Sequence, residues 1–197
     1  WKQPLYYQFD KTMTDNLLRA IISEVDEAGY KIVALVSDLG GGNRKLWSDL
    51  GVTSSTPYFA HPTSEGRKIW VFADVPHLVK LLRNHFLDSG FRWKDCNIEK
   101  YVIETILKRD SGELRLCPKL SWNHLTVQQN DRQRVSTAIE LFSHHTASAI
   151  RFILPHEHIT ADFFHIVNEF IDVMNSSVPH HSSNKLKCGF GVNFEEQ

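Results

Sequence analysis

The run of five apolar residues Ile32–Val36 constrains the fold of this chain more than any other feature of its sequence. No polar residue interrupts it, and several of its side chains are β-branched, which is typical of a strand that is buried on both faces of a sheet. The run ends at Ser37 and Asp38, and a glycine turn at residues 40–42 follows. Because such a strand needs helices to cover it, the sequence predicts an α/β unit.

The first ninety residues alternate between segments expected to be strands and segments expected to be helices. The expected strands of one sheet are Leu5–Phe9, Ile32–Val36 and Lys68–Ala73. The expected helices cover residues 15–28, after a cap at Thr14 and before a stop at Gly29, then residues 43–50, and residues 75–87. Residues 54–66 are rich in Ser, Thr and Pro and are expected to form a loop.

Beyond Gly90 the apolar residues recur at helical spacing, and we expect the chain to be helical from about residue 95 onward. The expected caps of its helices are Asn97, Asp131 and Thr160. The second of these helices is expected to continue to Ile150. This change from alternating strands and helices to helices alone predicts a boundary near residue 90, with one domain at residues 1–90 and another at residues 91–197.

Composition narrows the class of protein. Lys and Arg number 22 and Asp and Glu number 23, and the two signs balance in both halves of the chain, which counts against tight DNA binding by this piece alone. No apolar run approaches the ~20 residues that span a bilayer, so no membrane contact is expected. The three cysteines are far apart and indicate neither a disulfide framework nor a zinc pair.

Asp38 is the first candidate for chemistry. A carboxylate at the carboxyl end of a buried strand lies where α/β sheets bind ligands, and its hard oxygen atoms suit Mg²⁺. The alternative is that Asp38 only caps the following turn, and spacing alone slightly favours that alternative. Asp74 has a similar setting, but Pro76 two residues later makes it a natural helix cap, so for Asp74 the structural interpretation is preferred.

Polar residues of the helical half could bind a nucleotide. Asp172 and Asn175 are three residues apart and share one helix face, and a carboxylate can accept both the N1–H and the N2 amino hydrogens of guanine. Lys119 could contact phosphate, as could Arg132 or Arg134 near the start of the long helix, although no P-loop glycine pattern occurs. Spacing alone favours solvated positions for all of these side chains.

Five segments resemble P-element-type DNA transposases and their THAP-domain vertebrate relatives. Residues 31–43, K-I-V-A-L-V-S-D-L-G-G-G-N, resemble the segment around the second catalytic aspartate of that family. Residues 71–85 hold the pattern D-x-P-H-L-x-K-x-x-R-N, which is highly specific to the family. The other three segments resemble its insertion domain and are residues 119–125, 135–147 and 161–176. The resemblance covers nearly the whole chain in the family's order.

The resemblance implies a mixed α/β, RNase H-like partial domain at residues 1–90, followed by an all-α, GTP-binding insertion domain at residues 91–197 that is incomplete. The family's catalytic domain binds two Mg²⁺ ions through three acidic residues, of which Asp38 matches the second. The other two fall outside this chain, so we expect a fragment that is inactive alone, within a full-length enzyme that cuts and joins DNA.

The resemblance also assigns the nucleotide contacts. Lys119, Val135, Asp172 and Asn175 match positions that contact GTP in the family, and Arg134 is a neighbouring basic position. Val135 would act through its backbone or by packing, because its side chain has no polar group. GTP would be a positioning cofactor that is not hydrolysed. The implied partners are transposon-end and target DNA, reached through the full-length protein in the nucleus, and a homo-oligomer is left open.

Two alternatives to an active transposase remain. A domesticated relative would keep the nucleotide-binding insertion as a binding or scaffold module without cleavage, and the acidic residues outside this chain would distinguish it. A small α/β hydrolase that uses Asp38 with a histidine is disfavoured, because no nucleophile elbow occurs in the sequence.

Overall fold

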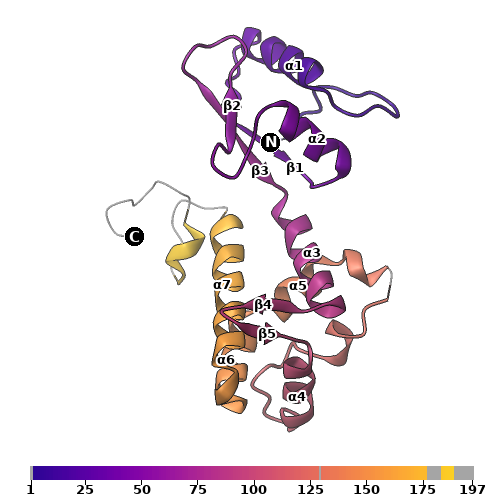
Figure 1. Cartoon of the computed structure of the whole chain (residues 1–197), viewed down its shortest axis with the longest axis vertical. Helices are drawn as coiled ribbons and strands as arrows, with labels where there is room; N and C mark the ends of the chain where they lie inside the picture. Colours follow the sequence, from indigo (N-terminus) through magenta and orange to yellow (C-terminus); the bar gives the residue numbers. More distant parts are fainter. Residues whose placement is uncertain (1, 129, 177–182, 189–197) are drawn as a thin grey trace. The chain divides into compact units, whose positions relative to one another are not determined.

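The structure is a computed structural model that describes residues 2–128, 130–176 and 183–188 (Figure 1). The chain forms two compact units that divide between Asp74 and Val75. The helix α3 (Val75–Asp88) packs against helices of the second unit and belongs to it. The division of the chain therefore comes earlier than the change of secondary structure near residue 90 suggested.

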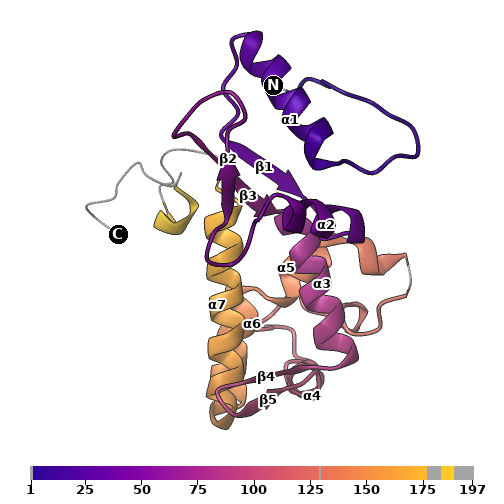
Figure 2. The same ribbon diagram turned by 45° about the horizontal axis from the view of Figure 1, so that its top comes forward.

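The first unit is built on a three-stranded mixed sheet with the order β1-β3-β2 (Figures 1 and 2). Strand β1 (Ala34–Ser37) runs parallel to β3 (Lys68–Ala73), and the register places Ser37 opposite Ala73. Strand β2 (Tyr58–Ala60) pairs antiparallel with β3. Because β1 and β3 are parallel, the residues that follow both strands lie at the same edge of the sheet.

Helices α1 (Asp15–Glu27) and α2 (Gly41–Asp49) contribute to one apolar core with this sheet. The buried members of this core are Leu18, Ile22, Leu46, Leu50, Phe59, Ile69 and Val71. Burial alternates along β3, so that Trp70 and Phe72 are exposed on its other face, and Val36 of β1 is 60% exposed. The expectation that the run Ile32–Val36 is buried on both faces is therefore wrong, because only one face of the sheet is covered in this unit.

Local signals predicted part of the first unit correctly. Thr14 caps α1 by accepting a hydrogen bond from the Leu17 N–H at 3.4 Å, and Gly29 follows the helix with a φ of +88°. Strand β3 has the predicted bounds Lys68–Ala73. Two predictions are wrong. Residues 5–9 form no strand, because even aromatic residues of high β-propensity need the free edge of another strand to pair with. The short strand β2 lies in the segment that was expected to be a loop.

The second unit is mainly helical. After α3, its elements are β4 (Phe91–Trp93), β5 (Cys96–Ile98), α4 (Tyr101–Arg109), α5 (Val135–Leu141), α6 (His144–Ile153) and α7 (His158–Met174), with short 3-10 turns η1 (Trp122–His124), η2 (Asp131–Gln133), η3 (Pro155–Glu157) and η4 (Lys185–Lys187). Its core centres on three rings, Phe86, Phe142 and Phe164, whose centroids lie 5.0 to 5.8 Å apart. Helices α6 and α7 lie side by side along the unit (Figures 1 and 2).

The hairpin β4–β5 corrects the prediction that strands stop after Gly90. Its strands are joined by Lys94 and Asp95, which both adopt positive φ values, 50° and 60°, as tight hairpin turns require. Asn97 pairs within β5 rather than capping a helix, and α4 begins at Tyr101. The prediction that residues 131–175 contain no strand is confirmed.

The helix expected from Asp131 through Ile150 is divided in the structure. Asp131 opens the turn η2, α5 begins only at Val135, and α5 ends before Phe142. Ser143 then caps α6, and its Oγ accepts from the Thr146 N–H at 3.3 Å, so a local side chain stops one helix and starts the next. Thr160 is buried inside α7 instead of capping it, because α7 begins one turn earlier.

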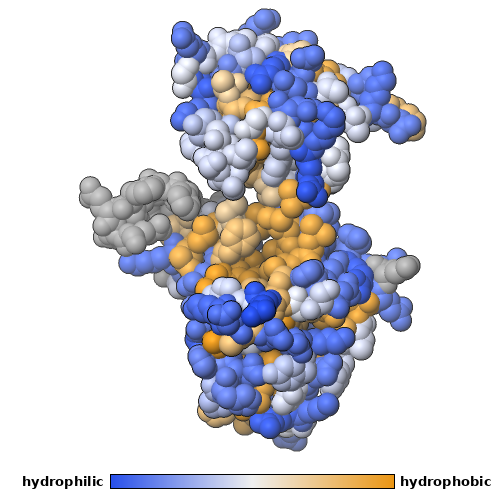
Figure 3. Space-filling view, viewed as in Figure 1, coloured by the Kyte–Doolittle hydropathy of each residue, from blue (hydrophilic) through white to orange (hydrophobic). Residues whose placement is uncertain are grey.

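Within the second unit an apolar groove runs between α3 and α7. Figure 3 shows the apolar surface gathered there. The groove is lined by Leu78, Val79, Leu82, Ile166, Val167 and Phe170. Among the described residues, no helix is both long and apolar enough to cross a bilayer.

Candidate functional site

Asp38 is exposed immediately after β1, at the carboxyl edge of the sheet. Its Oδ1 accepts two hydrogen bonds of 2.8 Å, one from the Gly40 N–H and one from Asn43 Nδ2. The Asp74 N–H donates to the Ser37 carbonyl at 2.8 Å, which places both aspartates after paired strand ends. Asp38 therefore does cap the turn, as the structural alternative held, and it is also an accessible carboxylate at the carboxyl edge of the sheet, where α/β sheets commonly bind ligands.

Asp38 can supply one ligand to a metal ion, but it does not form a complete metal site by itself. Its carboxylate oxygens are hard donors of the kind that Mg²⁺ prefers, and neighbouring hydrogen bonds fix their orientation. Across residues 2–128, 130–176 and 183–188, no three His, Cys, Asp or Glu side chains lie close enough together to hold a metal ion. A metal site at Asp38 would need ligands from other protein segments.

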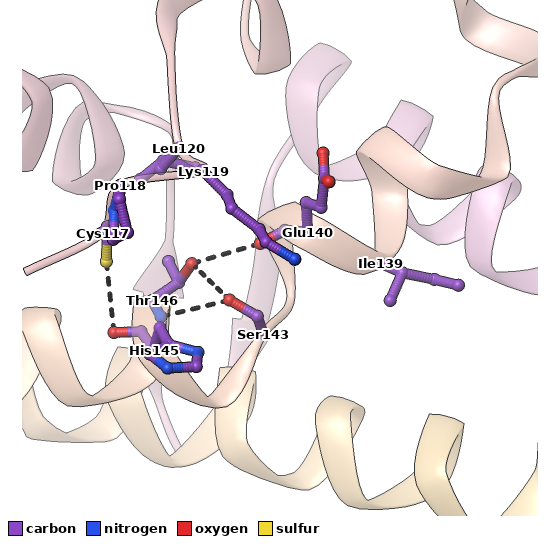
Figure 4. Close-up of a pocket in the computed structure, with 9 residues that line it drawn as sticks. All are labelled: Cys117, Pro118, Lys119, Leu120, Ile139, Glu140, Ser143, His145 and Thr146. Carbon is purple, nitrogen blue, oxygen red and sulfur yellow. Dashed lines mark hydrogen bonds between the residues drawn. The ribbon is translucent and has the colours of Figure 1, made fainter.

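Lys119 borders a pocket of about 230 Å³ in the second unit (Figure 4). The pocket is formed by the segment between α4 and η1 and by the junction of α5 and α6, and its lining is Cys117, Pro118, Lys119, Leu120, Ile139, Glu140, Ser143, His145 and Thr146. Figure 4 shows the Lys119 side chain extending from the Cys117–Leu120 segment toward Glu140. The site thus combines one cation with two hydroxyl groups and one carboxylate.

Hydrogen bonds fix the pocket wall. The hydroxyl groups of Ser143 and Thr146 are 3.0 Å apart, and Thr146 also donates to the Glu140 carbonyl at 3.4 Å. Cys117 Sγ donates to the His145 carbonyl at 3.2 Å. Burial, and then the nearby Asp110 carboxylate, raise the pKa of the Cys117 thiol to about 11, so it remains protonated at neutral pH and is a wall residue rather than a nucleophile.

A buried carboxylate fixes the segment that carries Lys119. Asp110 is 8% exposed, and its two oxygens accept hydrogen bonds of 2.9 Å from the backbone N–H groups of Leu116 and Cys117. Arg115 closes the same loop by donating to the carbonyl groups of Asp110 at 3.0 Å and Leu120 at 2.5 Å. The position of Lys119 is therefore set by contacts on both sides of it.

Asp172 is held in a polar network near the end of α7. Its side chain is only 16% exposed. Its Oδ2 accepts from Asn168 Nδ2 at 3.2 Å and from Asn184 Nδ2 at 2.9 Å, while Lys187 Nζ lies 3.3 Å from its Oδ1. The alternative of a solvated polar stripe is therefore wrong for Asp172.

Asn168 connects this network with the start of α6. Its Oδ1 accepts from the His144 N–H at 3.1 Å, while its Nδ2 donates to Asp172. His144 lies between the pocket residues Ser143 and His145. Asn168 thus links Asp172 to the wall of the Lys119 pocket. Asn175 is exposed at the C-cap of α7, one turn beyond Asp172.

The two arginines near the start of α5 have different environments. Arg134 is 68% exposed, and its Nε lies 3.0 Å from Asp131 Oδ1. Arg132 instead donates two hydrogen bonds of 2.7 and 2.6 Å to the carboxylate of Asp88, and these bonds lower the pKa of Asp88. Of the two, only Arg134 has its guanidinium mostly in solvent. Val135 is the first residue of α5.

Sequence reasoning missed Arg83 as an individual residue. Arg83 is fully buried, and its guanidinium donates to backbone carbonyl groups of residues 131, 132 and 134. The only signal in the sequence was its place in the pattern D-x-P-H-L-x-K-x-x-R-N. Asn184 and Lys187 were also missed, since nothing in their local sequence connects them with Asp172.

Comparisons with known proteins cover both units of the chain. Over 195 residues it is 38% identical to the Transposable element P transposase of Drosophila melanogaster, which corresponds to 95% of this chain and 26% of that protein. Over 199 residues it is 25% identical to the DNA transposase THAP9 of Homo sapiens, covering 89% of this chain and 21% of that protein. The solved Drosophila P element transposase strand transfer complex matches 95% of this chain, and 44% of that one, with a TM-score of 0.88 and 38% identity.

These matches confirm the resemblance to P-element-type transposases that the motifs indicated. The chain spans about a quarter of the length of the curated relatives it matches. The family model described as TNP-like, GTP-binding insertion domain matches residues 76–187, which is nearly the whole described part of the second unit. This protein chain therefore belongs to the TNP-like, GTP-binding insertion domain family.

Proposed function

We propose that this chain is part of a cut-and-paste DNA transposase. In this proposal the second unit binds GTP as a positioning cofactor that is not hydrolysed, and the first unit is part of an RNase H-like, Mg²⁺-dependent catalytic domain. The observation that carries the proposal is the match to the P element transposase over 95% of the chain, at 38% identity and a TM-score of 0.88.

The phosphate groups of GTP are assigned to the pocket beside Lys119. Its volume of about 230 Å³ is below the ~300–1,000 Å³ of pockets that enclose a whole small ligand, so it suits one part of a nucleotide. The Lys119 ammonium group supplies the positive charge there. Arg134 is not part of the pocket lining, and it is assigned a separate phosphate contact from its mostly exposed position before α5. Val135 would act through its backbone N–H or by packing.

Asp172 is assigned to guanine. Its two carboxylate oxygens match the N1–H and N2 donors of that base, and adenine offers no such pair. Asn184 and Lys187 contact the same oxygens, so guanine would have to displace or share at least one of them. Asn175, one turn farther along α7, is assigned a supporting contact.

Asp38 is assigned as one of the acidic ligands of the catalytic metal ions. When bound, two Mg²⁺ ions would activate a water molecule or a DNA 3′-hydroxyl group and stabilise the leaving oxygen. The contribution of this chain is a carboxylate whose orientation is fixed by Gly40 and Asn43. The remaining acidic ligands come from outside this chain, so the chain alone is inactive.

The partners follow from the proposed activity. Transposon-end and target DNA would be bound by the full-length protein in the nucleus, since the net charge of this chain is only −1.

Calorimetric titration of GTP and ATP into the full-length protein tests the nucleotide assignment. Lys119→Ala should weaken binding of both nucleotides, more strongly at low salt, because it removes a phosphate contact. Asp172→Ala should weaken GTP about ten- to hundredfold and leave ATP unchanged, since a charge-assisted contact contributes roughly 1.5–3 kcal/mol. An unchanged preference for GTP in Asp172→Ala would refute the guanine assignment.

The catalytic assignment is tested with Asp38→Ala, which should abolish strand cleavage and joining while GTP binding persists. Asp49→Ala is a matched control on α2, where the carboxylate makes only an exposed ion pair with Lys45. Normal transposition by Asp38→Ala in Mg²⁺ would contradict the assignment. If the wild type binds GTP but neither cleaves nor joins DNA, the chain belongs to a binding module of the domesticated kind.

A further inference from the structure

The guanidinium group of Arg83 satisfies all of its hydrogen-bonding capacity inside the second unit. Its Nη2 donates to the carbonyl groups of Asp131 at 3.3 Å and Arg132 at 2.6 Å. Its Nη1 donates to the Arg134 carbonyl at 3.4 Å and to Thr137 Oγ1 at 2.8 Å. Its Nε donates to the side chain of Asn84, the next residue, at 3.2 Å. A guanidinium group has five N–H donors, and all five have acceptors here.

Burying the charged guanidinium group costs free energy of folding. In this structure the buried group fixes the position of the loop. Arg83 is fully buried, and no carboxylate of the described residues forms an ion pair with it. Burial, and then the neighbouring Arg132, lower the pKa of Arg83, which shows that the protein environment disfavours its charge. Buried charges usually have an ionic partner, whereas here neutral carbonyl groups of one short loop take that place.

Two further side chains of α3 hold the same loop. Lys80 Nζ donates to Gln133 Oε1 at 3.3 Å. Asp88 accepts both hydrogen bonds of Arg132. Lys80, Arg83 and Asp88 are spaced over about two helical turns, so α3 contacts η2 at three heights. The buried Arg83 lies between these two exposed contacts and makes more hydrogen bonds to the loop than either of them.

The loop leads directly to two of the residues assigned to the nucleotide. Arg134 follows η2, and Val135 begins α5. Three of the five acceptors of Arg83 are carbonyl groups of residues 131, 132 and 134, and Thr137 belongs to the first turn of α5. A shift of this loop would move the Arg134 side chain and the Val135 backbone together.

We infer that Arg83 is a positioning residue for nucleotide binding, which it supports by fixing the loop Asp131–Val135 through its backbone carbonyl groups. The inference rests on the proposed GTP binding. It assigns a role to Arg83, the arginine of the family pattern. Arg83 would act on the nucleotide indirectly, by fixing the loop. Lysine cannot replace it, since an ammonium group has three donors and no planar fork to span adjacent carbonyl groups.

The test compares Arg83→Lys with Arg109→Lys in the full-length protein. Arg109 is an exposed arginine on α4 that donates to the Ile153 carbonyl, so its replacement is a chemically identical change away from the loop. We expect Arg83→Lys to weaken GTP binding about tenfold or more, with ATP and GTP affected alike, because loop residues contact no base-specific group. Arg109→Lys should leave the Kd unchanged.

Two readouts separate positioning from general loss of stability. Backbone amide exchange should accelerate in residues 131–137 of Arg83→Lys and stay unchanged in α7. In Arg83→Ala, millimolar guanidinium ion should restore GTP affinity without restoring the melting temperature to that of the wild type. Unchanged GTP affinity in Arg83→Lys, beside normal binding by the wild type, overturns the inference alone. No GTP binding by the wild type overturns the proposed function and the inference with it.

Discussion

Replacing Asp110 with Asn should destabilise the second unit far more than a charge-neutralising change normally does. The Asp110 side chain is nearly buried, and each of its oxygens accepts one backbone N–H of the Lys119 segment, from Leu116 and from Cys117. Asparagine has almost the same volume, but it offers one acceptor oxygen and one NH₂ group. One backbone N–H would therefore face another donor.

The magnitude follows from these two contacts. A hydrogen bond to a charged group contributes about 1.5–3 kcal/mol, and the substitution removes one of the two completely. The remaining bond loses its charge and with it about half of its strength. Because Cys117 is buried, its N–H cannot turn to water instead. The expected loss in the free energy of unfolding is about 2–4 kcal/mol.

Urea unfolding followed by far-UV circular dichroism measures this loss, since most helices belong to the second unit. With a slope of about 2 kcal/mol per molar urea, the midpoint should fall by about 1–2 M. The control is Asp95→Asn, whose carboxylate is 97% exposed and pairs weakly with Arg92 at 3.6 Å, and it should change stability by less than about 0.5 kcal/mol. A loss below about 1 kcal/mol for Asp110→Asn would show that these hydrogen bonds do not hold the segment.

Three further outcomes are expected. Asn184→Ala should tighten GTP binding a few-fold in calorimetry, because it removes a competitor for Asp172; weaker binding would show that the amide supports the site instead. Labelling with a thiol reagent at pH 8 should be much slower at Cys117 than at Cys96, because Cys117 is buried and its pKa is raised to about 11, whereas Cys96 is partly exposed. The thiol of Cys117 is favoured in the folded state, so its stabilising contribution is complete below the ordinary thiol pKa of 9.0 and is lost as the pH rises through about 11. Gly90→Ala should lower the melting temperature, since φ is +69° and a Cβ atom would lie 2.7 Å from a backbone oxygen.

Elements that depend on neighbouring residues along the chain could be predicted from the sequence. The cap at Thr14 and the stop at Gly29 define α1, and both signals act within one helical turn. The run of β-branched and aromatic residues Ile69–Phe72 equally marks β3, which has the predicted bounds Lys68–Ala73. Such features need no knowledge of the rest of the fold.

Strands that depend on a partner could not be predicted reliably. The apolar residues 5–9 have a high β-propensity and yet form no strand, while Tyr58–Ala60 forms one inside a polar segment because β3 offers it a free edge. The hairpin at residues 91–98 could not be predicted either. Its turn needs positive φ values, and the sequence Lys94-Asp95 is not typical of such a turn.

The candidate site shows the same division between local and distant information. The family patterns supplied Lys119 and Asp172 as single residues, but their environments depend on distant parts of the chain. Asp110 lies nine residues before Lys119, and Asn184 lies beyond the end of α7. Spacing alone favoured a solvated Asp172 because the residues that cover it follow α7 in the sequence and have no periodic relation to it.

The structure gives a physical reason for part of the pattern D-x-P-H-L-x-K-x-x-R-N. One face of α3 buries Val79 and Phe86 in the core of the second unit. Between them, Lys80 and Arg83 hold the loop that precedes α5. A single helix thus has to satisfy apolar packing and a set of directional hydrogen bonds at the same time. The pattern leaves the packing position Val79 open and specifies Lys80, Arg83 and Asn84, which are the residues of this hydrogen-bond set.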